Sequence, residues 1–153
     1  MEIKSLRDRP ELNNQKKHKK AYDRFNAILE ELRKKEIPER IVNVINKHVD
    51  EINEADSDEK NLKKLLRKKQ TSLLQLLEKE LKIVPKNKYM SLWMALGMSF
   101  GIPIGVAFGS ALGSMAYLGL GLPIGMSIGM AIGSSMDKKA KEEGRQLDVN
   151  LGL

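Results

Sequence analysis

The chain has 153 residues, with 27 Lys and Arg against 20 Asp and Glu, a net charge of +7, two His and no Cys. The lack of cysteine excludes disulfides, thiolate nucleophiles, zinc ribbons and cysteine-ligated iron clusters, and two histidines alone cannot form a transition-metal site. We therefore expect neither a metal nor another cofactor.

The first twenty residues carry scattered charges and contain no apolar run that could serve as a secretory signal. We therefore expect the chain to begin on the cytoplasmic side. Residues 1–16 are polar and show no clear periodicity, and they are predicted to form a flexible basic arm.

Apolar residues then recur every three or four positions, which is the spacing of a helix with one buried face. The pattern predicts three helices, at about 17–35, 38–53 and 56–83. They form a helical cytoplasmic domain over 17–84, either as a three-helix bundle or as an extended stalk. His48 on the second helix is interpreted as a structural residue rather than as a pH-sensitive contact.

An uncharged segment of 48 residues follows, from Tyr89 to Met136. Crossing a hydrocarbon core of ~30 Å takes ~20 helical residues. The segment therefore predicts two transmembrane spans, at about 89–114 and 119–136, with a turn at 115–118. Because Lys residues lie beyond both outer ends and none lies in the turn, we expect both termini to be cytoplasmic in a multi-pass protein of the cell inner membrane.

Basic and aromatic side chains flank the uncharged segment, as is typical of anchors at a membrane–water interface. The predicted anchors are Lys86, Lys88, Tyr89, Trp93, Lys138 and Lys139. Residues 137–153 are predicted to form a charged cytoplasmic tail.

Glycines in the uncharged segment follow a four-residue register that only Tyr117 interrupts. Small residues at this spacing let two helices approach closely in a membrane. The stretch GIPIGVAFGSALGS also matches GLPIGMSIGMAIGS, twenty residues later, at eight of fourteen positions, which indicates an internal duplication. The predicted helix-packing residues are Gly97, Gly101, Gly105, Gly109, Gly113, Gly121, Gly125, Gly129 and Gly133.

The glycine register drifts around the helix, because four residues advance a position by about 40°. From Gly97 to Gly113 the drift amounts to about 160°, which is more than one partner helix covers. We therefore expect a second packing neighbour and a homo-oligomer. Pro103 and Pro123 occupy equivalent places in the two repeats and are predicted kink sites, with Pro123 in the first turn of its helix.

The units FGIPIGVAFGSALG and LGLPIGMSIGMAIG, followed by MDKKAKEEG, resemble the glycine-zipper family of poorly characterised prokaryotic membrane proteins with paired GxxxG helices. The likeness covers about residues 89–145. It implies a pair of packed helices that self-associate in a membrane. In the wider class, such helices occur in channels, pore-forming peptides and envelope lipoproteins.

No nucleophile–base pair, phosphate-binding loop or carboxylate dyad is recognisable, so we expect no enzyme. The leading hypothesis is an all-α, homo-oligomeric integral membrane protein that anchors or scaffolds its basic helical domain. The alternatives are a pore-forming, toxin-like effector and a hairpin buried in a large soluble assembly. The expected partners are the lipid bilayer with its anionic headgroups, a second copy, and a cytoplasmic protein; nucleic acid is not expected because few aromatics accompany the lysines.

Overall fold

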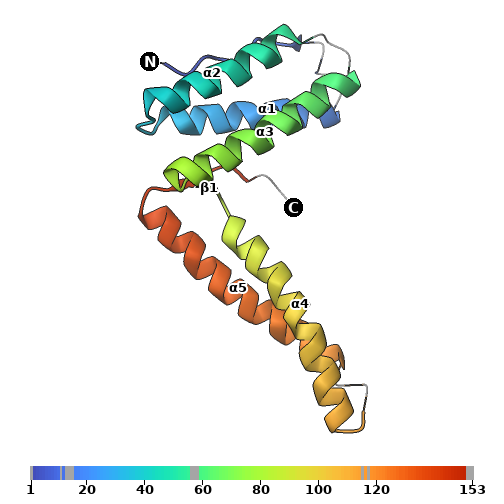
Figure 1. Ribbon diagram of the computed structural model, residues 1–153. Helices are drawn as coiled ribbons and strands as arrows, with labels where there is room; N and C mark the ends of the chain where they lie inside the picture. Colours follow the sequence, from blue (N-terminus) through green and yellow to red (C-terminus); the bar gives the residue numbers. More distant parts are fainter. Residues whose placement is uncertain are drawn as a thin grey trace. The chain divides into compact units, whose positions relative to one another are not determined.

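The computed structural model describes residues 2–10, 12, 16–55, 59–114, 116 and 118–150. Within them the all-α prediction is confirmed, since five helices and two strands of two residues each are found (Figure 1). The chain divides into two compact units. The first is Met1–Ile83 with Leu147–Leu151, and the second is Val84–Gln146 with Gly152–Leu153.

The first unit contains helices α1 (Lys16–Arg33), α2 (Glu39–Glu54) and α3 (Glu59–Leu81), which lie side by side (Figure 1). All three begin and end within a few residues of the predicted positions. Their apolar faces share one core, so these helices form a bundle rather than a stalk. The largest fully buried side chains of the core are Phe25, Ile28, Leu29, Leu32, Ile41, Ile45, Ile52, Leu62, Leu66, Leu73, Leu77 and Leu147.

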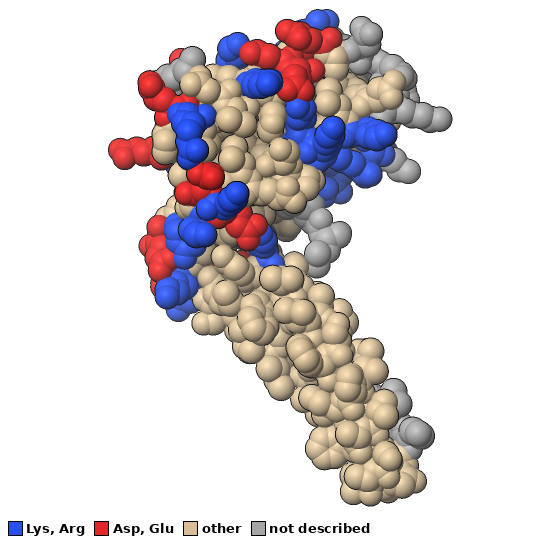
Figure 2. All heavy atoms as spheres, viewed as in Figure 1, with Lys and Arg blue, Asp and Glu red and all other residues tan. Residues whose placement is uncertain are grey.

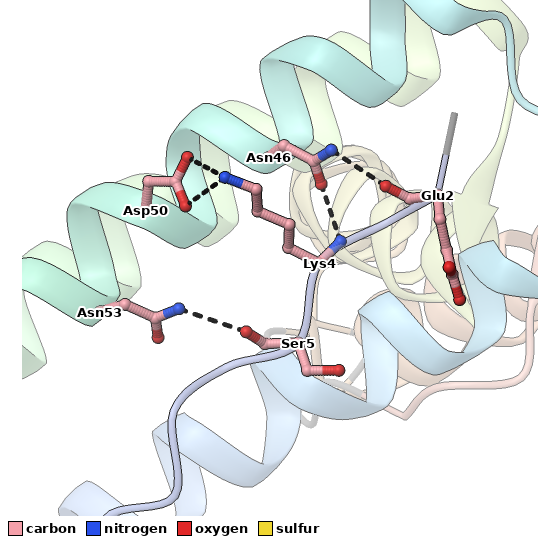
Figure 3. A network of polar contacts seen from close by, with 6 residues as sticks. All are labelled: Glu2, Lys4, Ser5, Asn46, Asp50 and Asn53. Carbon is pink, nitrogen blue, oxygen red and sulfur yellow. Dashed lines mark hydrogen bonds and ion pairs between the residues drawn. The ribbon is translucent and has the colours of Figure 1, made fainter.

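The prediction of a flexible arm over 1–16 is corrected for residues 2–9, which run along α2 (Figure 3). Ile3 is buried in the core, and the amides of Asn46 and Asn53 hydrogen-bond to the backbone of the segment. Apolar periodicity did not reveal this packing because these four hydrogen bonds go to main-chain groups, which every residue carries.

His48 is a buried group of α2 with an unsatisfied ring nitrogen. The side chain is 8% exposed and its Nδ1 has no hydrogen-bond partner. Burial, together with the nearby charges of Lys69 and Lys47, holds the pKa of His48 below its ordinary value of 6.5, although Glu51 acts in the opposite direction. The neutral imidazole is therefore the form that the folded bundle favours.

We expect the bundle to lose stability as the pH falls below 6.5. The depressed pKa means that unfolded His48 takes up a proton which the folded form resists, so the free energy of unfolding falls as the pH approaches the folded pKa. Chemical unfolding at pH 7.5 and pH 5.5 measures this effect. His48→Gln removes the titrating group, and an unchanged pH dependence in that variant would contradict the assignment.

The second unit contains strand β1 (Val84–Pro85) and helices α4 (Lys88–Ala111) and α5 (Leu118–Glu142), and the boundary between the units falls within strand β2 (Gln146–Leu147). The strands pair in a two-stranded sheet. The two helices run antiparallel to each other (Figure 1). Of the predicted turn, Met115 and Tyr117 lie outside the described residues.

Both helices of the second unit end at a glycine in the left-handed conformation, which L side chains rarely adopt. α4 ends earlier than predicted because Gly113 has a φ of 66°, and the next amide, Ser114 N, donates to Gly109 O at 3.0 Å. α5 continues past Met136 through the charged residues that follow. It ends before Gly144, whose φ is 68°.

Candidate functional site: the glycine interface of α4 and α5

The faces that α4 and α5 turn toward each other consist largely of glycine. In α4, Gly97 is partly buried and three later glycines are buried; in α5, four glycines are buried. We call these eight residues the glycine interface. They are Gly97, Gly101, Gly105, Gly109, Gly121, Gly125, Gly129 and Gly133.

The two backbones approach so closely that no side chain fits between them. A Cβ atom at Gly97 would lie 2.8 Å from the carbonyl carbon of Gly125, and a Cβ at Gly125 would lie 2.8 Å from the Cα of Gly101. At Gly121 the added atom would lie 2.6 Å from the backbone nitrogen of Gly105. Cβ atoms essentially never lie closer than 3.0 Å to such atoms, so glycine is required at these positions.

The contact continues toward the start of α4, where that helix has no glycine. A Cβ at Gly129 would lie 2.7 Å from the carbonyl carbon of Trp93, and one at Gly133 would lie 2.8 Å from the nitrogen of Met90. The register predicts that Gly113 also packs against the partner helix, and this prediction is wrong. An added Cβ there meets nothing within 4 Å, and the residue ends α4 instead.

Large apolar side chains point outward from the two helices. Every large hydrophobic residue that is exposed in the described part of the chain lies between Leu92 and Met136. Phe100 is 68% exposed, and Phe108 and Ile128 are 58% and 55% exposed. Figure 2 shows this part of the chain without charged residues. The pair therefore has small residues inside and large apolar residues outside, the reverse of a helix pair in water.

Two serine hydroxyls on the outward surface donate to carbonyls of their own helices. The Oγ of Ser99 donates to the carbonyl of Ala95 at 3.0 Å, and the Oγ of Ser134 donates to the carbonyl of Ala131 at 3.1 Å. These two hydroxyls need no water, so the exposed surface is compatible with hydrocarbon.

A buried carboxylate closes the charged end of the helix pair. Asp137 is 6% exposed and accepts hydrogen bonds from the backbone nitrogens of Tyr89, at 3.1 Å, and Met90, at 2.9 Å. The first amides of a helix have no partner within it, and Asn87, which precedes α4, makes no side-chain cap hydrogen bond. Asp137 of α5 thus caps α4 from outside that helix.

Sequence reasoning assigned Asp137 to the charged tail and missed this role. The register contains the signal, because position 137 lies four residues after Gly133 and therefore on the same helix face. A charged residue that continues a series of interface positions is expected to be buried, and a buried carboxylate requires donors.

The predicted interface anchors lie at the same end of the helix pair, because α4 and α5 are antiparallel. Lys88 begins α4, and Tyr89 and Trp93 are partly buried. Lys138 and Lys139 are exposed on α5 and lie 3.9 and 4.0 Å from Glu142 and Glu143 respectively. Lys86 lies in the turn between β1 and α4.

The two predicted kink sites lie inside continuous helices. Pro103 is an interior residue of α4, as predicted. Pro123 is the sixth residue of α5 rather than part of its first turn, because α5 begins at Leu118. A kink at either proline stays a prediction.

No group of three or more His, Asp or Glu side chains that could hold a metal ion occurs in the described part of the chain. The site therefore offers a packing surface and a helix cap. In comparisons with known proteins, no family model, no curated protein and no solved structure matches the chain.

Proposed function

We propose that the chain is an integral membrane protein whose α4–α5 hairpin crosses the bilayer and anchors the helical first unit to it. One observation carries the proposal: glycines fill the inside of the helix pair, whereas the large apolar side chains lie outside. In water each fully exposed side chain of this kind forgoes about 1.5–3 kcal/mol of burial free energy. In lipid the arrangement is favourable, because close backbone packing drives helix association there.

The dimensions of the helices support the proposal. Lys88–Ala111 and Gly119–Glu142 are each 24 residues long and apolar enough to cross a membrane. At 1.5 Å per residue each is about 36 Å long, against a hydrocarbon core of about 30 Å. The charged last turns of α5 would then lie in the headgroup region.

The distribution of charge supports an orientation. Residues 1–88 contain 23 Lys and Arg against 16 Asp and Glu, and further lysines follow Met136. The positive-inside rule then assigns both flanks of the hairpin to the cytoplasmic side of an inner membrane. Anionic headgroups on that side attract the basic surface of the first unit.

The proposed role is non-enzymatic. The glycines are not taken as evidence that the chain self-associates. The expectation of a homo-oligomer assumed that the neighbouring helix of the same chain leaves part of the glycine register exposed, so that a second copy could pack there. Within one chain, however, the partner helix lies against most of these glycines, namely Gly97, Gly101, Gly105, Gly121, Gly125, Gly129 and Gly133. A homo-oligomer stays part of the proposal, and the outward apolar faces of the helix pair offer it an exposed surface.

The pore-forming alternative finds no specific support. A pore needs a polar lining, but the hydroxyls of Ser99 and Ser134 donate to their own helices, and the glycine backbone faces the partner helix. The segment from Tyr89 to Met136 has no charged side chain that could select ions.

Membrane extraction tests the proposal. After alkaline carbonate treatment of membranes from expressing cells, we expect the protein in the pellet. We also expect no dye leakage from vesicles that contain it, because leakage would favour the pore. Recovery of the wild-type protein in the carbonate supernatant would contradict membrane insertion.

A matched pair of variants sharpens this test. Phe108→Asp with Ile128→Asp places charges at two exposed positions, which water would tolerate but hydrocarbon would penalise by about 3 kcal/mol each. We expect this variant to be released from the membrane. Lys64→Asp with Lys68→Asp, on α3, changes the charge twice without touching the hairpin and should remain in the pellet.

A further inference from the structure

The first unit holds residues 2–9 in the way that a protein holds a bound peptide (Figure 3). The amide of Asn46 accepts a hydrogen bond from the backbone nitrogen of Lys4 at 2.8 Å and donates to the carbonyl of Glu2 at 3.0 Å. A neighbouring β-strand makes the same pair of bonds to an extended chain. Asn46 thus recognises main chain rather than a particular side chain.

A second asparagine repeats this contact further along the segment. The amide of Asn53 accepts from the nitrogen of Arg7 at 2.8 Å and donates to the carbonyl of Ser5 at 3.2 Å. Seven residues of helix rise about 10.5 Å, and three residues of extended chain span about 10 Å. The spacing of the asparagines on α2 therefore matches an extended backbone.

Helix α1 supplies further contacts to the main chain. The guanidinium of Arg33 donates to the carbonyls of Ile3, at 3.3 Å, and Lys4, at 3.1 Å. The hydroxyl of Tyr22 donates to the carbonyl of Arg7. We call Asn46, Asn53, Arg33 and Tyr22 the peptide ladder.

Two side chains of the segment enter the bundle deeply, six positions apart. Ile3 is 7% exposed and joins the core. Arg9 is 4% exposed, and its Nη2 donates to the carbonyls of Ile52, at 3.0 Å, and Ala55, at 2.7 Å. Guanidinium charge is favourable at this end of α2, where the helix dipole is negative. The first unit thus holds an apolar side chain and, six positions later, an arginine.

Residues 2–9 leave space beside Ile3. A cavity of about 450 Å³ adjoins Ile3, and its walls include Leu32 of α1, Ile37 of the connection that follows and Val42 of α2. A side chain bulkier than isoleucine would fill more of it. A second copy of the chain would offer the same Ile3 and leave the same space, so the cavity favours a different occupant.

We propose that the peptide ladder is a docking site for an extended segment of a partner protein, with a large apolar residue and an arginine six positions after it. Residues 2–9 occupy the site as an internal competitor. The inference does not depend on membrane insertion, because every group that it uses belongs to the first unit.

Peptide binding to a variant that lacks residues 2–9 tests this proposal. The probe is a fluorescent peptide with the sequence EIKSLRDRP, and the protein is the otherwise full chain in detergent. We expect saturable 1:1 binding, weakened about tenfold or more in the intact chain by internal competition. Ile3→Phe in the peptide should tighten binding, and Arg9→Lys should weaken it, because lysine lacks the planar fork of donors.

The ladder itself is tested by Asn46→Ala with Asn53→Ala in the deleted protein, which should weaken peptide binding about tenfold or more through the loss of four hydrogen bonds. A matched control, Asp50→Ala, removes only the exposed ion pair with Lys4 and should change the affinity little. If the deletion unfolds α1–α3, the intact chain with Ile3→Ser and Arg9→Gln replaces it. That variant should bind the wild-type peptide more tightly than the unaltered chain does.

Three results would overturn the proposal. The first is a folded deletion variant that does not bind the peptide, and the second is binding that the asparagine substitutions leave unchanged. The third is disulfide-linked dimers from a mixture of Ser5→Cys and Asn53→Cys chains, because these would show that the occupant is a second copy.

Discussion

Gly125→Ala is expected to open the α4–α5 hairpin, whereas Gly119→Ala is expected to leave it closed. The methyl group at position 125 would lie 2.8 Å from the Cα of Gly101, and backbone cannot rotate away as a side chain can. Overpacking of this kind typically costs about 1–3 kcal/mol. At Gly119, also on α5, an added Cβ meets nothing within 4 Å.

The fluorescence of Trp93 can measure this difference, because it is the only tryptophan in the chain and its backbone contacts Gly129. During titration of detergent-solubilised protein with SDS, we expect Gly125→Ala to shift the transition to lower SDS and Gly119→Ala to leave it in place or raise it slightly. Equal midpoints for the two variants would show that close backbone approach does not hold the hairpin together.

Asp137→Ala is expected to destabilise the hairpin by about 2 kcal/mol. The substitution leaves the amides of Tyr89 and Met90 without their buried carboxylate acceptor and removes a negative charge from the positive end of α4. Asp137→Asn retains one acceptor oxygen, so it should retain part of the stability.

Hydrogen exchange at the first turn of α4, together with the SDS titration, measures this effect. We expect Asp137→Ala to accelerate exchange of the Tyr89 and Met90 amides. The matched control is Glu142→Ala, which removes an exposed carboxylate of the same helix that is 3.9 Å from Lys138 and should change stability by less than about 0.5 kcal/mol. Similar behaviour of these two alanine variants would exclude a capping role for Asp137.

The sequence was sufficient to locate all five helices. In α1–α3 the apolar residues recur with helical spacing and meet in one core, so side-chain pattern and packing agree. In α4 and α5 the glycine register predicted the face that each helix turns to its neighbour, although Gly113 ends α4 and does not pack.

Two features depend on main-chain groups that apolar periodicity does not mark, although the four-residue register does place Asp137 on the interface face of α5. Residues 2–9 are held in part through their carbonyls and amides, and Asp137 binds the exposed amides at the start of α4. Any residue could supply these backbone groups, so no composition or spacing in residues 2–9 or at the start of α4 marks them.

The expected second neighbour of the glycine register depended on an assumption about helix shape. The drift of about 160° was calculated for a straight helix beside a straight partner. Two helices that wrap around each other follow such a drift, and a repeat longer than 3.6 residues favours a right-handed wrap. One partner helix can then cover much of the register, as α5 lies against Gly97, Gly101 and Gly105.

Cysteine labelling tests the central claim, that α4 and α5 cross a bilayer, most directly. The chain has no cysteine, so single cysteines at Lys86, Ser110 and Lys141 can be probed with a membrane-impermeant maleimide in inverted inner-membrane vesicles. We expect labelling at positions 86 and 141, which face the outside of such vesicles, and none at position 110 until detergent is added. Labelling of all three positions in intact vesicles would contradict the account.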